Sequence, residues 1–223
     1  MSTRVLRGVS FLALFSTAIQ AQGKDEPSST VPITVYTDFQ SAHSSQVLES
    51  LKSELTAVMG PIGLTFEWRD LKAARGNEVA VELVVVSFKG KCQMEGTLPT
   101  HPETGALGWT HMSDGDVLPF SDVDCDRVRN LIGSQILGGS PADRERVFGR
   151  ALGRVVAHEL YHIFANTTRH ASLGVAKAFY TASELVTEDF YFEAKETKSL
   201  RHGKLRHLFQ PRAPVLKGLT SGQ

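Results

Sequence analysis

The feature that most constrains this chain is a long amphipathic helix, expected from residue 140 to about residue 166. Ser140-Pro141-Ala142-Asp143 is a favourable helix start, because serine can cap, proline suits the first turn and aspartate meets the positive end of the helix dipole. Apolar residues then recur at helical spacing, at Phe148, Leu152, Val156, Leu160 and Ile163. A helix with such a stripe is expected to pack against the core of the domain.

This helix carries the sequence HELYH at residues 158–162. His158 and His162 are separated by one helical turn, so both imidazoles project from the same face and can reach one metal ion. Glu159 stands where such motifs have a general base that takes a proton from a water on the metal. The alternative is that both histidines are polar groups with ordinary hydrogen-bond partners.

A catalytic zinc needs a third protein ligand and one open position. His170 follows the segment IFANTTR, whose small and polar residues indicate that the helix ends near Asn166 and the chain turns back. We expect His170 to be the third ligand, because it needs only this local turn. The alternatives are Glu184 and Glu188 on the next predicted helix, the arrangement of the gluzincins.

The stretch HELYHIFANTTRHASLGVAKA resembles the metzincin clan of zinc endopeptidases. It is more similar to a variant in exported bacterial proteins, roughly HExGHxLL…HxxxG-[IL]-M-[RK]-A, with a longer loop before the third histidine. The resemblance implies one zinc ion per chain, a peptide or protein substrate and Glu159 as general base. It also implies that the metal ligands are His158, His162 and His170. The turn beneath the metal would contain Gly174, Val175, Lys177 and Ala178.

Three positions depart from the family pattern. Tyr161 and Ala165 replace glycines of the motif, and Ala176 replaces the methionine of the turn. The methionine is a packing residue, so its loss should affect rigidity more than coordination. A non-catalytic, exported zinc-binding or interaction module therefore stays open beside the peptidase. Tyr180 follows the turn, where some metzincins have a tyrosine that assists the oxyanion; a tyrosine that only packs in the core is the alternative.

Upstream of the helix, β-branched runs predict strands at 31–39, 64–68 and 79–88, and helical spacing predicts a helix at 44–59. The run at 79–88 is expected to be a buried central strand. Residues 105–112 and 116–120 look like edge strands, with Pro119 indicating an edge position and His111 expected on the surface. Further helices are expected from Asp122 and from the capping box Thr181–Glu184 to about Leu200. The predicted class is α+β, with a metzincin-like mixed twisted sheet, a long active-site helix and a C-terminal helical part.

The first residues have the layout of a secretory signal, with arginines followed by an apolar run too short to span a membrane. We expect a signal peptide at 1–21, a flexible leader at 22–30, one catalytic domain at 31–200 and a basic, partly disordered tail at 201–223. The product would be secreted or periplasmic, without stable membrane insertion.

Export favours a disulfide between Cys92 and Cys125, the two cysteines of the chain; two buried free thiols are the alternative. With 24 basic and 24 acidic residues, the chain has no net charge that would favour nucleic acid.

Overall fold

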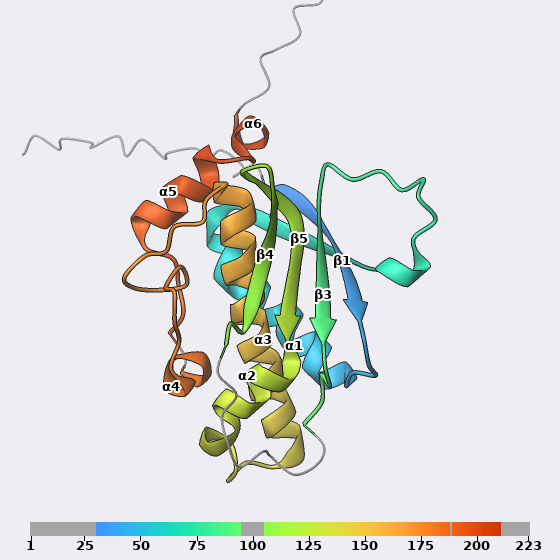
Figure 1. The fold of residues 1–223 in the computed structure, drawn as a ribbon, viewed down its shortest axis with the longest axis vertical. Coiled ribbons are helices and arrows are strands. Elements are labelled where there is room, and N and C mark those ends of the chain that lie inside the picture. Colours follow the sequence, from blue (N-terminus) through green and yellow to red (C-terminus); the bar gives the residue numbers. More distant parts are fainter. Residues whose placement is uncertain (1–29, 95–104, 188, 211–223) are drawn as a thin grey trace, which may run out of the picture.

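The computed structural model describes residues 30–94, 105–187 and 189–210. The expected signal peptide, most of the leader, Glu188 and the tail from residue 211 lie outside these residues. The described chain forms a five-stranded sheet in the order β2-β1-β3-β5-β4 (Figure 1). The strands are β1 (Val31–Phe39), β2 (Leu64–Asp70), β3 (Glu82–Lys89), β4 (Gly108–Ser113) and β5 (Asp116–Asp124). Four of them run parallel and β4 pairs antiparallel with β5, which confirms the α+β class with a mixed sheet.

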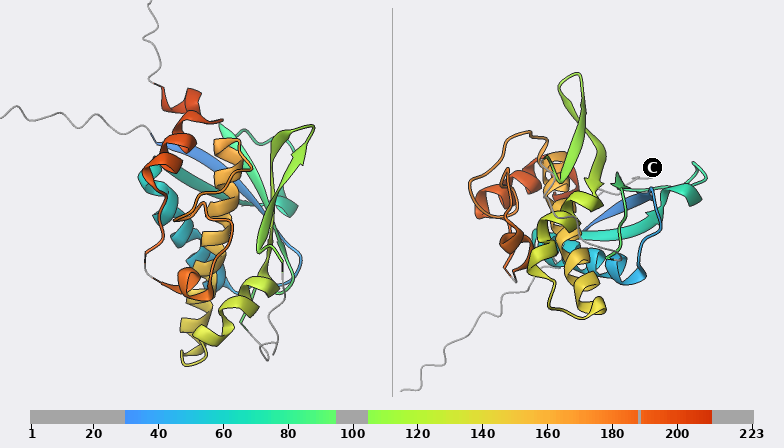
Figure 2. Two further views of the ribbon diagram at one scale, coloured as in Figure 1. Left: turned by 60° about the vertical axis from the view of Figure 1, so that its left-hand side comes forward. Right: turned by 60° about the horizontal axis from the view of Figure 1, so that its bottom comes forward.

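Two helices, α1 (Ser45–Met59) and α3 (Pro141–Ala165), pack on one face of this sheet (Figure 2). The predicted run at 79–88 is the central strand β3, but it is buried on one face only. Val84, Val86 and Phe88 face the helices, whereas Leu83 on the opposite face is 39% exposed. The predicted central position is confirmed, and the burial is limited to one face, because a β-branched run does not show whether one or both faces of its sheet are covered.

The helix α3 begins and ends as the sequence indicates. The Ser140 hydroxyl accepts a hydrogen bond from the Asp143 N–H, with Pro141 in the first turn. Asn166 closes the helix in a left-handed conformation, with φ of 50°.

Two glycines let α3 approach α1 closely. A Cβ at Gly149 would lie 2.3 Å from the carbonyl oxygen of Val47, and one at Gly153 would lie 2.8 Å from that of Leu51. The helix α3 is therefore seated against α1 at backbone contact distance.

A buried ion pair also joins α1 and α3. Arg154 is fully buried, and its Nε donates to Glu54 at 2.7 Å. Its Nη1 donates to the carbonyl oxygen of Glu184 at 2.9 Å, and its guanidinium lies over the ring of Phe190. The side chain of Arg154 thus links α3 to the C-terminal part of the domain.

Two predictions for the region after β3 need correction. Pro119 does not lie in an edge strand, because β5 has β3 on one side and β4 on the other. Its missing N–H is tolerated because pairing with β3 starts only at Phe120 and the β4 pairing is irregular between Thr110 and Met112. The helix expected from Asp122 is α2 (Cys125–Ile132), since β5 continues to Asp124, which caps α2.

The C-terminal part contains α4 (Ala182–Val186), α5 (Ala194–His202) and α6 (Arg206–Phe209). The capping box of Thr181 and Glu184 is present, but the single helix predicted to about Leu200 is interrupted. Phe190 and Phe192 pack inward while Tyr191 between them is 60% exposed, which is the alternation of an extended segment. Short 3-10 turns occur at Gly60–Ile62, Leu71–Ala73 and Gly133–Gln135.

The folded part extends beyond the predicted boundary at residue 200. Leu205 is fully buried, the Lys204 N–H donates to the carbonyl oxygen of Phe164 at 2.8 Å, and Arg201 Nε donates to that of Ile62 at 3.0 Å. The residues from 201 to 209 therefore pack on the domain, and this part of the expected tail is ordered by contacts.

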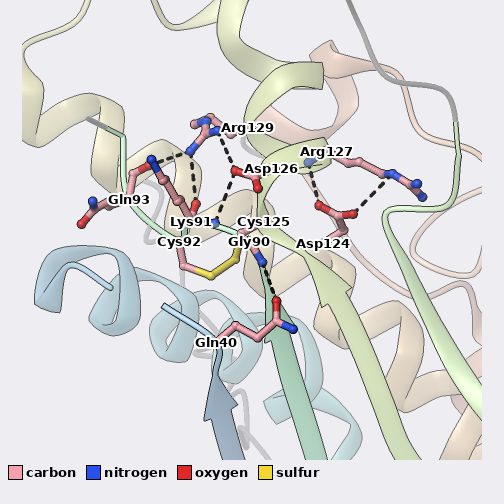
Figure 3. Close-up of a disulfide and its surroundings, with 10 residues drawn as sticks. All are labelled: Gln40, Gly90, Lys91, Cys92, Gln93, Asp124, Cys125, Asp126, Arg127 and Arg129. Carbon is pink, nitrogen blue, oxygen red and sulfur yellow. Dashed lines mark hydrogen bonds and ion pairs between the residues drawn. A yellow bond between two sulfur atoms is a disulfide. The ribbon is translucent and has the colours of Figure 1, made fainter. Parts of the chain in front are cut away.

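Cys92 and Cys125 form the predicted disulfide, with Cα atoms 5.1 Å apart (Figure 3). It links the loop after β3 to the first residue of α2. Arg129 strengthens the same junction, since its guanidinium donates to the carboxylate of Asp126 at 2.6 Å and to the carbonyl oxygen of Lys91 at 3.3 Å. In the described part of the chain, no helix is long and apolar enough to cross a membrane.

Candidate metal centre

His158 and His162 lie side by side on the buried face of α3, with their Nε2 atoms 3.0 Å apart. Each Nδ1 atom lies against a backbone carbonyl: that of His158 is 2.8 Å from the Val175 oxygen, and that of His162 is 2.7 Å from the Thr167 oxygen. A carbonyl oxygen only accepts hydrogen bonds, so both Nδ1 atoms carry the proton. Both Nε2 lone pairs are thereby left facing one common point, as in histidines that bind a metal.

His170 reaches the same point from the loop that follows α3. The left-handed turn at Asn166 reverses the chain, and the Ala171 N–H donates to the carbonyl oxygen of Ala176 at 2.7 Å. The His170 ring stacks on His158, with centroids 5.2 Å apart. One nitrogen from each of His158, His162 and His170 lies within 4.8 Å of the others. Ligands of a tetrahedral zinc are about 3.4 Å apart for bonds of about 2.05 Å, so this set fits a metal ion.

Burial keeps the two helix histidines in the neutral form that binds metals. Their side chains are in the core, His158 being 7% exposed and His162 8%. Burial lowers the pKa of His158 to about 3, helped by the neighbouring His162 and His170 and opposed by the hydrogen bond to Val175. The pKa of His162 is lowered for the same main reason. Protons should therefore compete with a metal for His158 only well below neutral pH, and the lowered pKa of His162 acts in the same direction.

Glu159 lies beneath the edge strand β4 and is 3% exposed. The Thr110 hydroxyl donates to its carboxylate at 2.7 Å. Burial raises the pKa of Glu159 to about 7, against the opposing effect of this hydrogen bond. β4 comes so close that a Cβ at Gly108 would lie 2.8 Å from a carboxylate oxygen of Glu159. Glu159 is thus a carboxyl group poised to take up and release a proton near neutral pH.

A cleft of about 660 Å³ opens over the three histidines and Glu159. Its walls come from two sides: β4 with Trp109, Thr110 and Met112, and the loop after α3 with Phe179 and Tyr180. Among the described residues that line it, none is charged apart from Glu159 and the histidines. The described walls of the cleft are therefore largely apolar, and their ionisable groups gather at the candidate metal centre.

A turn lies beneath His158, at the place where the resemblance puts one. Gly174 has φ of 67°, and a Cβ there would lie 2.6 Å from the carbonyl oxygen of Tyr191. That same oxygen accepts a hydrogen bond from the Val175 N–H at 3.1 Å. Val175 and Ala176 are buried. The turn is held by backbone contacts, and Ala176 is the small side chain that packs inside it.

The structure places the remaining candidate residues as follows. Tyr180 lines the cleft wall, and its hydroxyl lies 2.9 Å from Nδ1 of His158. Glu184 is bound to Lys177 and Thr181 and is not part of the histidine cluster. His111 is on the surface, paired with Asp122 at 2.6 Å, as expected. Sequence reasoning missed Thr110; its only signal was a threonine in a predicted edge strand.

No family model and no curated protein matches the chain. Among solved structures, it is similar to archaemetzincin from Methanopyrus kandleri, with a TM-score of 0.46. The sequence identity is 12%, and the alignment covers 80% of this chain and 97% of that chain.

Proposed function

We propose that this protein is an exported zinc-dependent peptidase, with His158, His162 and His170 as the metal ligands and Glu159 as the general base. One observation carries the proposal: three imidazole nitrogens converge within 4.8 Å at the floor of a cleft, beside a buried carboxyl group. Three imidazoles leave the fourth position of a tetrahedral zinc open, as in catalytic sites. Structural zinc sites, by contrast, are closed by four protein ligands.

The chemistry follows from the groups of this chain. When bound, zinc would acidify a water molecule and polarise the carbonyl of the peptide bond. Glu159 takes a proton from the attacking water and delivers that proton to the leaving amine. Thr110 keeps the carboxylate in place during this exchange.

The substrate proposed is an extended polypeptide. β4 pairs with β5 on one side, and its other edge is not paired with any described strand. An extended peptide can bond to such an edge through its backbone. β4 also lines the cleft, so a peptide placed there would have its backbone near Glu159 and the histidines.

The proposal is tested with the mature protein, its Glu159→Gln variant and a broad peptide library. We expect wild type to bind one zinc per chain and to lose hydrolysis when the metal is chelated. The variant should keep the zinc and lose at least about 100-fold in kcat, because the amide cannot accept the proton. Equal hydrolysis by the variant would contradict the mechanism. Zinc binding by wild type without any hydrolysis would instead support the non-catalytic zinc module, which the missing turn methionine at Ala176 suggests.

A further inference from the structure

We infer that Tyr180 is a positioning residue that holds the His158 imidazole against the turn, in the place where this chain lacks the turn methionine. The inference concerns the metal site on which the proposed function rests. It assigns Tyr180 a role in metal binding and none in stabilising the oxyanion.

Three atoms meet behind the His158 ring. The Nδ1 atom of His158, the carbonyl oxygen of Val175 and the hydroxyl of Tyr180 are all within hydrogen-bond distance of one another. The Tyr180 ring also meets the His158 ring edge to face, with centroids 5.7 Å apart and planes at 85°. Its other neighbour is Phe190, at 5.5 Å between centroids. Tyr180 is therefore packed between the metal-ligand histidine and the C-terminal segment.

The direction of each hydrogen bond can be assigned from the chemistry of the groups. The carbonyl oxygen of Val175 can only accept, so the Tyr180 hydroxyl donates to it. The Nδ1–H of His158 then has two acceptors, the Val175 carbonyl at 2.8 Å and the Tyr180 oxygen at 2.9 Å. All three groups are satisfied in this arrangement. The hydroxyl proton of Tyr180 is used at the turn and is not directed to a substrate oxyanion.

This arrangement should affect metal affinity through His158. Acceptors at Nδ1 fix the tautomer and the ring orientation and make Nε2 a better ligand, and loss of such a partner typically weakens metal binding about 10- to 100-fold. Ala176, at the position where the family pattern has a methionine, is buried and has no long side chain that could pack on His158. The ring of Tyr180 packs on His158 instead, while its hydroxyl ties the imidazole to the turn carbonyl.

The test compares Tyr180→Phe with wild type by zinc affinity, measured by competition with a chelator, and by the visible absorption spectrum after cobalt substitution. Phenylalanine keeps the ring contacts and removes only the hydroxyl. We expect zinc affinity to fall about 10-fold and the cobalt spectrum to change.

The matched control is Tyr36→Phe. Tyr36 is buried whereas Tyr180 is partly buried, and the Tyr36 hydroxyl likewise has a hydrogen bond, from Arg69 at 3.3 Å, but Tyr36 belongs to the sheet. This variant should bind zinc as wild type does, which separates a local role from a general loss of stability. Far-UV circular dichroism of the metal-free proteins verifies the fold of both variants.

Unchanged zinc affinity in Tyr180→Phe, with or without a lower kcat, would overturn the inference. A lower kcat at unchanged affinity would assign the hydroxyl to the oxyanion instead. Absence of peptide hydrolysis in wild type would contradict the proposed function but leave the affinity comparison, and hence the inference on Tyr180, fully testable.

Discussion

The Thr110 hydroxyl on β4 donates a 2.7 Å hydrogen bond to the carboxylate of Glu159 on α3. The same hydroxyl lies 3.0 Å from the Ser121 hydroxyl on β5, so the contact is anchored in the sheet. It links the strand that borders the cleft to the proposed general base. The position of the edge strand and that of the proposed general base are thus set together.

The buried state of Glu159 predicts a pH-dependent stability for the metal-free protein. Its folded pKa of about 7 lies above its ordinary value of 4.5, so the folded state favours the protonated form. The stabilisation of the folded state by protonated Glu159 is complete below pH 4.5 and is lost as the pH rises through 7. Glu159→Gln cannot ionise, so between pH 4.5 and pH 8 its stability relative to wild type should rise by roughly 3 kcal/mol.

Urea unfolding in the presence of a chelator measures this difference. Thr110→Val serves as the companion variant: it removes the hydrogen bond that lowers the pKa of Glu159, so its own stability should fall more steeply with pH than that of wild type. A difference between Glu159→Gln and wild type that is the same at both pH values would show that Glu159 is not held in its protonated form.

Gly108→Ala should separate β4 from α3. The new Cβ would lie 2.8 Å from Glu159 Oε1 and 2.9 Å from Val155 Cγ1, so the strand or these two side chains must shift. We expect a loss of about 1–3 kcal/mol in the free energy of unfolding. If the proposed function holds, hydrolysis should fall as well, because the Thr110–Glu159 bond is stretched. Gly60→Ala, with no atom within 4 Å of its new Cβ, is the control. Identical stability of the two variants would refute the close approach.

The third metal ligand can be identified from zinc affinity. His170→Ala removes a nitrogen from the cluster and should weaken zinc binding by more than the roughly 10- to 100-fold effect of losing a supporting residue. Glu184→Ala should keep the zinc and reduce only stability, by about 1 kcal/mol, since it disrupts a capping box. Retention of zinc in the first variant and its loss in the second would assign the ligand to Glu184.

Gly149→Ala tests how closely α3 packs against α1. Alanine favours a helix over glycine by about 1 kcal/mol, so an exposed site would gain stability. At Gly149 the added Cβ would lie 2.3 Å from the Val47 carbonyl oxygen, a backbone atom that cannot move aside alone. We expect the free energy of unfolding to fall by about 1–3 kcal/mol. Thermal unfolding measures the effect. The control is Gly138→Ala, where nothing lies within 4 Å of the new Cβ, and its melting temperature should be close to that of wild type. Equal melting temperatures would contradict the close packing of α1 and α3.

Much of the framework was predictable because its signals are local. Ser140 and Asn166 bound the long helix, and the four-residue spacing of His158 and His162 places them on one face. The disulfide was predicted from the expected signal peptide and from the cysteine count, and the structure has it. Predictions were wrong where contacts with distant parts of the chain determine the conformation. Pro119 lies in a strand that has a partner on both sides. Phe190 and Phe192 pack as an extended segment where a helix was predicted.

The sequence by itself determined the helix, its capping residues and the direction of its two histidines, because these depend on residues within a few positions of each other. The tertiary structure decided which residues surround Glu159 and the two histidines. Thr110 reaches Glu159 from an edge strand, and Val175 and Tyr180 meet the back of His158 from a later turn. These contacts join distant parts of the chain. Periodicity and spacing carry no information about them, since they exist only when the sheet, the long helix and the turn are packed together.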